Sequence, residues 1–170
     1  MSTPMRSISV DRVVVNIGVG EAGEKLLKAT KVLELVTGRK PVQTLSRRTI
    51  RDWGIRQGMP IGARATLRGK NAEEFLRKAF AIRNNRIAAY SFDPRGNFSF
   101  GVADYTDFEG MKYDPEIGVF GMDIAVVLRR PGYRIARRRI APRRIPTSHA
   151  ITKDEGIAFV RSRFGAEVVE

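Results

Sequence analysis

The sequence predicts an α+β fold, a mainly antiparallel sheet of about four strands with helices packed on one face, plus an Arg-rich extended arm. Two observations predict it. Apolar segments of strand length and amphipathic segments of helix length follow one another in the order β-α-β-β-α-β-β-α. One strand also alternates apolar and polar residues, which is typical of a sheet with one buried and one open face. The 170 residues, 42% of them hydrophobic, suit one domain spanning residues 1–170.

The first half of the chain supplies a strand, a helix and two further strands. Asp11–Val19 is rich in Val and Ile, which predicts a buried strand. Apolar residues recur at helical spacing over Glu21–Val36, and Gly38 is a natural helix stop. Val42–Ser46 and Ile61–Arg68 are then expected to be extended.

The strand expected at Ile61–Arg68 has the clearest alternation in the chain. Arg64, Thr66 and Arg68 would lie on one face, because successive strand side chains point to opposite sides. The apolar residues would form the core face: Ile61, Ala63, Ala65 and Leu67. The strand therefore predicts a cationic, hydroxyl-bearing surface opposite the core.

The middle of the chain reads as a helix, a turn and a strand. Asn71 and Glu74 form a capping-box pattern ahead of an amphipathic helix through Phe75–Arg83. Asp93–Asn97 is a turn sequence, and Phe98–Val102 alternates apolar residues on one face. A helix and a sheet strand joined by a tight turn are expected here.

The last third contains two segments that do not fit a regular element. Residues 104–121, the acidic connection, are expected to form a solvated loop before a strand at Met122–Leu128. Residues 129–146, the Arg-rich arm, have too many Arg and Pro for a packed element, so we expect an extended arm that becomes ordered on nucleic acid. Thr152 and Glu155 form a second capping box, which opens a short final helix.

Positive charge is concentrated in two places. The first basic segment, residues 39–70, holds nine Lys or Arg and one acid, and the second basic segment, residues 124–153, holds nine and no acid. The rest of the chain has a net charge of −4, against +13 for the whole. A slightly acidic body with two cationic surfaces is typical of a protein that meets a polyanion. Arg makes up 23 of the 31 bases, and its planar fork matches phosphate, so nucleic acid is favoured over membrane.

Composition excludes several other classes. The chain has no Cys and one His, which leaves no disulfide, thiolate nucleophile or multi-histidine metal site, and we expect neither metal nor cofactor. No apolar run approaches the roughly 20 residues that span a bilayer. Met1–Val10 has no signal-like apolar core, so we expect a cytoplasmic protein without membrane contact.

Three local patterns have competing interpretations. Gly18–Gly23 matches G-x-G-x-x-G between a strand and a helix, but the acid expected about twenty residues later is missing, so a tight turn is favoured over a dinucleotide site. His149 follows Ser148, and a surface histidine is favoured over a catalytic one because triads assemble in space. Trp53–Pro60, the finger loop, is either an exposed RNA-contacting finger or, through Trp53, part of the core.

Five motifs in order identify a family resemblance that covers essentially the whole chain. They are Val14–Glu21 (VVNIGVGE), Thr37–Pro41 (TGRKP), Gly54–Gly62 (GIRQGMPIG), Thr66–Gly69 (TLRG) and Gly96–Gly101 (GNFSFG). Together they resemble large-subunit ribosomal protein five, the 5S-rRNA-binding protein of the central protuberance. Gly121–Asp123 followed by Arg130–Tyr133 resembles the archaeal–eukaryotic branch.

The resemblance implies a non-enzymatic protein of the large ribosomal subunit that attaches 5S rRNA in the central protuberance. An open sheet face and adjoining loops would hold 5S rRNA through Asn16, Thr44, Ser46, Arg47, Arg48, Arg64, Thr66 and Arg68. The finger loop would contact peptidyl-site tRNA through Trp53, Gly54, Ile55, Arg56, Gln57, Gly58, Met59 and Pro60. The Arg-rich arm would reach large-subunit rRNA through Arg129, Arg130, Arg134, Arg137, Arg138, Arg139, Arg143 and Arg144.

Other partners and two rival functions follow from the same features. Neighbouring central-protuberance proteins are expected partners, and the acidic connection is one candidate for contact with a small-subunit head protein. Charge alone would also suit an architectural protein that coats DNA, which would bind duplex DNA and folded RNA equally. A small nucleotide-dependent enzyme that uses Gly18–Gly23 is the weaker rival.

Overall fold

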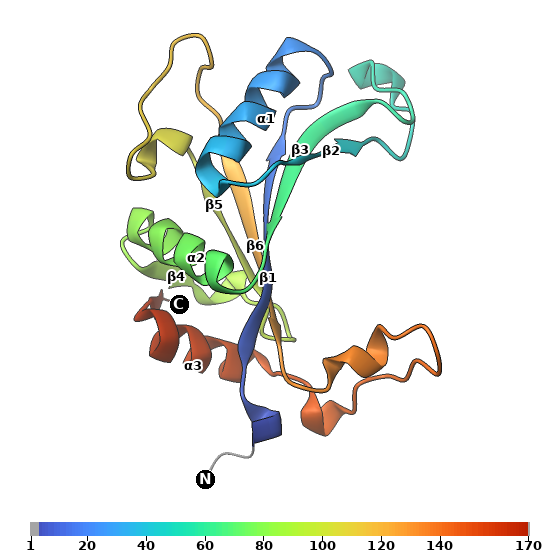
Figure 1. The fold of residues 1–170 in the computed structure, drawn as a ribbon, viewed down its shortest axis with the longest axis vertical. Helices are drawn as coiled ribbons and strands as arrows, with labels where there is room; N and C mark the ends of the chain where they lie inside the picture. Colours follow the sequence, from blue (N-terminus) through green and yellow to red (C-terminus); the bar gives the residue numbers. More distant parts are fainter. Residues whose placement is uncertain (1–3, 170) are drawn as a thin grey trace.

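A computed structural model describes residues 4–169. Its main feature is a five-stranded antiparallel sheet with the strand order β2-β3-β1-β6-β5 (Figure 1). The strands are β1 Ser9–Gly18, β2 Val42–Leu45, β3 Pro60–Leu67, β5 Phe98–Val102 and β6 Met122–Arg129. The predicted α+β class is confirmed, and the expected count of about four strands is low by one.

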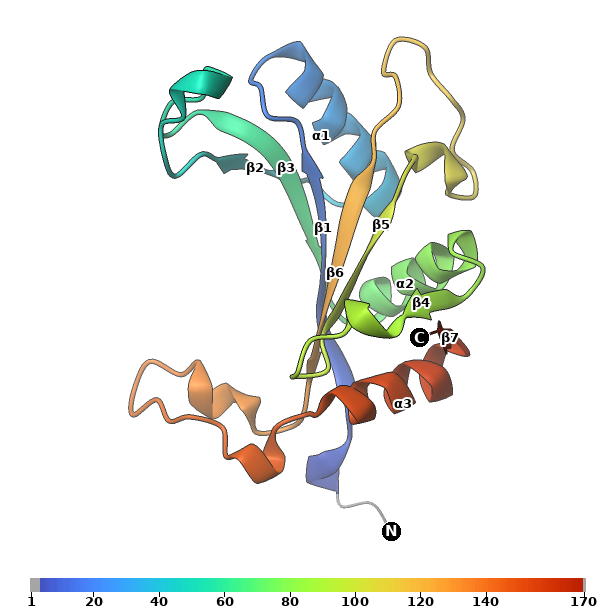
Figure 2. The same ribbon diagram turned by 180° about the vertical axis from the view of Figure 1, so that it is seen from behind.

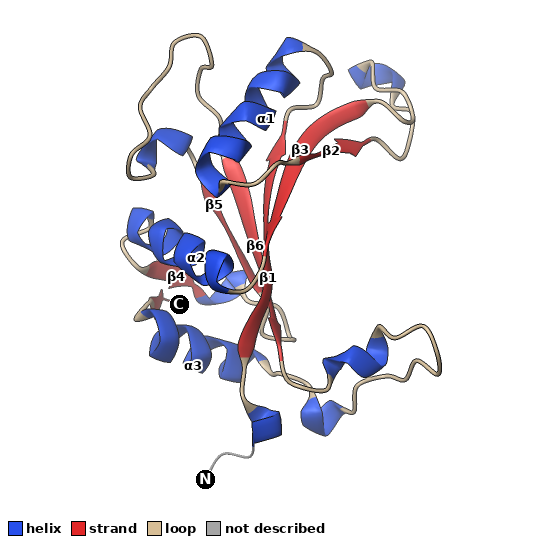
Figure 3. Ribbon diagram, viewed as in Figure 1, coloured by secondary structure: helices blue, strands red, loops and turns tan. Residues whose placement is uncertain are grey.

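Three helices cover one face of this sheet and leave the other face open (Figures 1 and 3). They are α1 Glu24–Thr37, α2 Lys70–Ile82 and α3 Lys153–Phe164. In β1, Val13, Val15 and Ile17 are almost completely buried, whereas the alternating residues on the other face are partly exposed. The core therefore lies between the sheet and the helices.

The helix boundaries follow capping chemistry, with one correction. Gly38 ends α1 in the left-handed conformation that glycine adopts readily, as predicted. The Thr152–Glu155 capping box is present at the start of α3. The predicted Asn71 cap is wrong, because α2 begins at Lys70 after Gly69, whose φ of 63° also favours glycine.

Two short strands, β4 Arg86–Ala88 and β7 Glu167–Val169, form a separate parallel pair that the sequence patterns did not predict. This pair joins the chain after α2 to the chain after α3. In residues 4–169 no helix has the length and apolar character needed to cross a membrane.

Two loops extend beyond the sheet on the side away from the helices, one at each end of the molecule (Figures 1 and 2). One joins β2 to β3 and includes the finger loop. The other joins β6 to α3 and includes the Arg-rich arm. The open face of the sheet lies between them.

Candidate nucleic-acid interface

The open face is built from residues that alternate with the core on each strand. Directly opposed residues of antiparallel strands share a face. Arg64 is opposite both Asn16 and Val42, and Asn16 is opposite Asp123. In the next row Thr66 is opposite Val14, and Val14 is opposite Ala125.

The predicted orientation of β3 is confirmed. Arg64, Thr66 and Arg68 are exposed, while Ala63, Ala65 and Leu67 are buried, and Ile61 is intermediate. The backbone of β1 and β3 fixes the spacing of these cations, and small or flat side chains lie beside them. The result is an exposed strand face with positive charge along β3.

None of the nine bases in the first basic segment forms an ion pair with any described residue. They are Arg39, Lys40, Arg47, Arg48, Arg51, Arg56, Arg64, Arg68 and Lys70, and all are exposed. Their charge is therefore not neutralised within the fold, and it remains available to an external anion.

The loop after β2 has an ordered base. Ser46 exchanges backbone hydrogen bonds with Met59 and Gly58, and its hydroxyl donates to the Arg48 carbonyl at 2.7 Å. Thr49 Oγ1 accepts from the Gln57 backbone N–H at 3.1 Å. Arg47 and Arg48 are thus presented from a turn of defined shape.

The finger loop has one buried residue and one prominent exposed residue. Ile55 is buried and pairs with Ile50 through two backbone hydrogen bonds. Trp53 is 72% exposed, so the alternative that places it in the core is wrong. An anchored loop that presents an indole to solvent can stack on a base.

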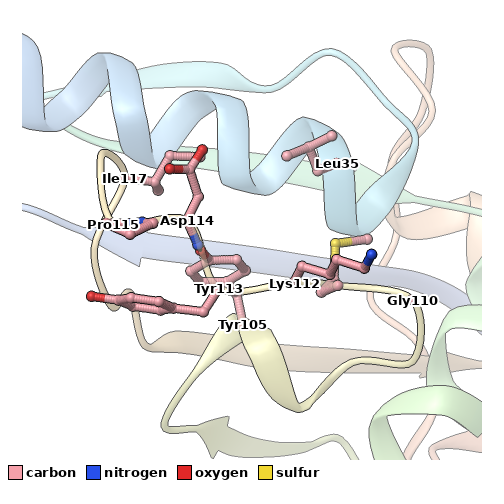
Figure 4. A pocket seen from close by; sticks show the side chains of 9 residues that line it. Leu35, Tyr105, Gly110, Lys112, Tyr113, Asp114, Pro115 and Ile117 are labelled. Carbon is pink, nitrogen blue, oxygen red and sulfur yellow. The ribbon is translucent and has the colours of Figure 1, made fainter.

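The acidic connection is more than a solvated loop. Tyr105, Phe108 and Phe120 are buried in the core, although the acidic side chains are half-buried or exposed. It also forms a pocket of about 510 Å³ against α1, lined by Leu35 of the helix and by Tyr113 and Ile117 of the connection (Figure 4). The expectation of a purely solvated segment is therefore wrong for its apolar residues.

The Arg-rich arm is not uniformly extended. It contains a 3-10 turn at Tyr133–Ala136, and the Arg138 Nε donates to the Ala141 carbonyl. Arg130 is only 3% exposed, donates from Nη2 to Glu155 at 2.6 Å, and also reaches the carbonyls of His149 and Ala150. The expectation that Arg130 contacts RNA is wrong, because its side chain is enclosed by the protein.

Asp11 binds two other arginines of this segment. Its carboxylate lies 2.9 Å from Arg137 Nη1 and 3.4 Å from Arg129 Nη1, and its side chain is 10% exposed. Both arginine side chains remain about half exposed. The other arginines of the arm are exposed and pair with no carboxylate in residues 4–169: Arg134, Arg138, Arg139, Arg143 and Arg144.

Glu155 has a lowered pKa, and the cause is its hydrogen bonding. Its carboxylate accepts from the Thr152 backbone N–H at 3.0 Å and pairs with Arg130. The Thr152 hydrogen bond is the largest cause that lowers the pKa of Glu155 below 4.5, and Arg130 lowers it further against an opposing effect of burial. Glu155 is therefore a structural anion.

The geometry favours a tight turn over a dinucleotide site at Gly18–Gly23, and a structural over a catalytic role for His149. At Gly18–Gly23, the N–H groups of Val19 and Gly20 both donate to the Ile61 carbonyl, so neither is free for a pyrophosphate. His149 Nε2 lies 2.9 Å from the Pro131 carbonyl, and its ring packs edge-on against Tyr133. The histidine therefore helps to close the base of the Arg-rich arm.

Comparison with known proteins agrees with this architecture. Residues 3–56 match the family model described as ribosomal protein L5, and residues 60–159 match the model for the C-terminus of the same ribosomal family. The chain is 54% identical over 167 residues to the large ribosomal subunit protein uL5 of Thermoplasma acidophilum, with 98% of both chains covered. It is 52% identical to the protein of that name from Sulfurisphaera tokodaii, over 98% of this chain and 95% of the relative. For Methanococcoides burtonii the identity is 50%, with 99% of both chains covered.

Proposed function

Since this chain belongs to the ribosomal L5 protein family, in its archaeal type, and is a structural rather than enzymatic protein of the large ribosomal subunit, we propose that it attaches 5S rRNA there. The open face and the loop after β2 hold the RNA. The finger loop contacts peptidyl-site tRNA, and the exposed outer arginines of the Arg-rich arm contact large-subunit rRNA.

The observation that carries the proposal is the unpaired cationic face. Arg64 lies on β3 beside Thr66 and Asn16, Arg68 directly follows the strand, and no carboxylate of residues 4–169 neutralises either arginine. A-form RNA offers a wide, shallow groove with 2′-hydroxyls and phosphates along its edges. Arg forks suit the phosphates, whereas threonine and asparagine side chains suit the hydroxyls.

The finger loop supports the tRNA contact separately. Ile55 is buried and pairs with Ile50 within the loop, whereas Trp53 and Arg56 are exposed. Aromatic and guanidinium planes stack on unpaired bases and pack against exposed RNA surfaces without requiring a particular sequence. The loop lies at the far end of the molecule from the Arg-rich arm, so the two can reach different RNAs (Figure 1).

The acidic connection is proposed as a protein-contacting side. It carries exposed Asp107, Glu109 and Glu116 beside exposed Tyr113 and Val119. Such a mixture of acidic and apolar groups suits a basic protein neighbour in the central protuberance or the small-subunit head better than RNA.

The test is equilibrium binding of purified protein to 5S rRNA, tRNA and a duplex DNA of equal length, over a range of salt concentrations. We expect the tightest binding to 5S rRNA, with an affinity that falls about 10³–10⁵-fold between 50 and 200 mM salt if six to ten phosphates are engaged. Equal binding to the duplex DNA would instead support the architectural DNA-coating function. A salt-independent affinity would overturn the electrostatic mechanism.

A further inference from the structure

A cleft of about 520 Å³ lies where the sheet meets the base of the Arg-rich arm. Its lining brings together the two basic segments, which are far apart in the sequence. The residues that matter for its chemistry are Ser9, Asp11, Arg68, Arg129, Arg134 and Arg137.

The cleft continues the open face. Arg68 follows β3 on the same side as Arg64 and Thr66, and Arg129 ends β6 directly opposite Ser9 of β1. Arg68 lies four positions after Arg64, a distance of about 13 Å at the usual rise per strand residue. A polyanion that follows β3 along the open face therefore arrives at this cleft.

The charge of the cleft is unbalanced. Four of its arginines are exposed at least in part, and Asp11 is their only carboxylate among the lining residues. Asp11 binds Arg129 and Arg137, whereas Arg68 and Arg134 have no carboxylate partner in residues 4–169. The cleft thus keeps an excess of positive charge that an anion can neutralise.

The walls are held in place before any ligand arrives. At the cleft, the Arg130 guanidinium forms an ion pair with Glu155. The Tyr133 hydroxyl accepts a hydrogen bond from the Ile151 N–H at 2.9 Å. The ordering of the arm base is thus already achieved in the folded protein, which lowers the entropic cost of binding.

We propose that this cleft binds the phosphate backbone of the RNA that lies on the open face, so that Arg134 and Arg137 form one continuous site with Arg68. The site rests on the proposed function and assigns the base of the Arg-rich arm to 5S rRNA, leaving the outer arginines for large-subunit rRNA.

The test compares two double variants in salt titrations with 5S rRNA. Arg68→Ala with Arg134→Ala removes the two unpaired cleft arginines. We expect the magnitude of the salt slope to fall by about 1.4–1.8, since each lost phosphate contact changes it by about 0.7–0.9. The control, Arg77→Ala with Lys78→Ala, removes the same charge from exposed, unpaired residues of α2 and should leave the slope unchanged. Unchanged thermal unfolding temperatures verify that both variants fold.

A second measurement needs no RNA and separates the possible failures. Arginine Nε–H signals are followed by NMR while inorganic pyrophosphate is added, and we expect those of Arg68, Arg129, Arg134 and Arg137 to shift before that of Arg77. Wild-type binding to 5S rRNA with a slope reduced by only about 0.7–0.9 in the cleft variant, the share of Arg68 alone, would overturn the cleft site and leave the proposed function standing. Failure of the wild type to bind 5S rRNA would overturn the proposed function. Pyrophosphate shifts in that case would replace the RNA site with one for a small anion.

Discussion

The two basic segments present their arginines in different ways. In the first, residues 39–70, strands and short turns hold nine bases at the surface and none is paired with a described carboxylate. In the second, residues 124–153, Arg130 is buried on Glu155, and Arg129 and Arg137 share Asp11. The two segments hold equal numbers of basic residues, but those of the first are all free to bind an external anion, whereas some of those in the second stabilise the fold.

This difference shows that distant carboxylates decide what an arginine does. Asp11 and Glu155 lie outside the second basic segment and bind three of its arginines: Arg130 becomes a structural residue, whereas Arg129 and Arg137 are held in place but remain about half exposed. The first basic segment has no such partners, so its charge remains directed outward. Four predictions test this contrast.

The largest expected effect concerns the open face. Arg64→Ala with Arg68→Ala should weaken 5S rRNA binding by at least 100-fold, because each charged hydrogen bond contributes about 1.5–3 kcal/mol. Filter binding at one fixed salt concentration measures it. Arg143→Ala with Arg144→Ala, at the exposed outer arm, is the matched control and should change binding far less. A greater loss in the control pair would show that the arm is the principal 5S rRNA contact.

The second prediction concerns stability. Arg130→Ala should lower the free energy of unfolding by about 3 kcal/mol, the low end of the range for breaking a buried ion pair, because Glu155 is partly exposed. Its neighbour Arg129→Ala should cost about 0–1 kcal/mol, as expected for a surface pair. Urea unfolding of both variants measures the difference, and equal losses would contradict the distinction between them.

The third prediction is a pH dependence. The folded protein lowers the pKa of Glu155 below 4.5, so its stabilisation is complete above pH 4.5 and is lost as the pH falls through the lowered pKa. Unfolding free energies of wild type and Glu155→Gln should therefore converge towards acidic pH. A constant difference between pH 3 and 7 would exclude this linkage.

The smallest effect on stability is expected at Trp53. Trp53→Ala should change the unfolding free energy by less than about 0.5 kcal/mol, because the indole is exposed. Trp53 is the only tryptophan, so its fluorescence reports on the finger loop alone. We expect tRNA to quench it more strongly than 5S rRNA, and the reverse order would move the 5S rRNA contact to the finger loop.

Periodicity predicted the elements whose faces differ sharply in polarity. The orientation of Arg64, Thr66 and Arg68 followed from alternation, and the start of α3 followed from the Thr152–Glu155 pair. Each signal lies within a few residues of the feature that it specifies. Local sequence patterns were therefore sufficient to predict most strands of the sheet and the residues of the open face.

Features that depend on distant partners were missed. Arg130 resembles its arginine neighbours in sequence, and only the tertiary structure brings Glu155, in the first turn of α3, within 2.6 Å of it. The pairing of β4 with β7 joins segments about eighty residues apart, each three residues long. Trp53 was ambiguous because an indole suits either a core or a stacking surface, and Ile55 occupies the buried position instead.

The Arg130–Glu155 ion pair also affects how much sequence change the arm tolerates. It joins the two ends of the intervening loop, so the tip around residues 138–142 can change in length with little effect on the core. Doubling the length of a flexible loop costs only about 0.6 kcal/mol in closure entropy. The folding of the body is thus insensitive to the length of the tip, and the rRNA contacts proposed for Arg138 and Arg139 are what limits such changes within the ribosome.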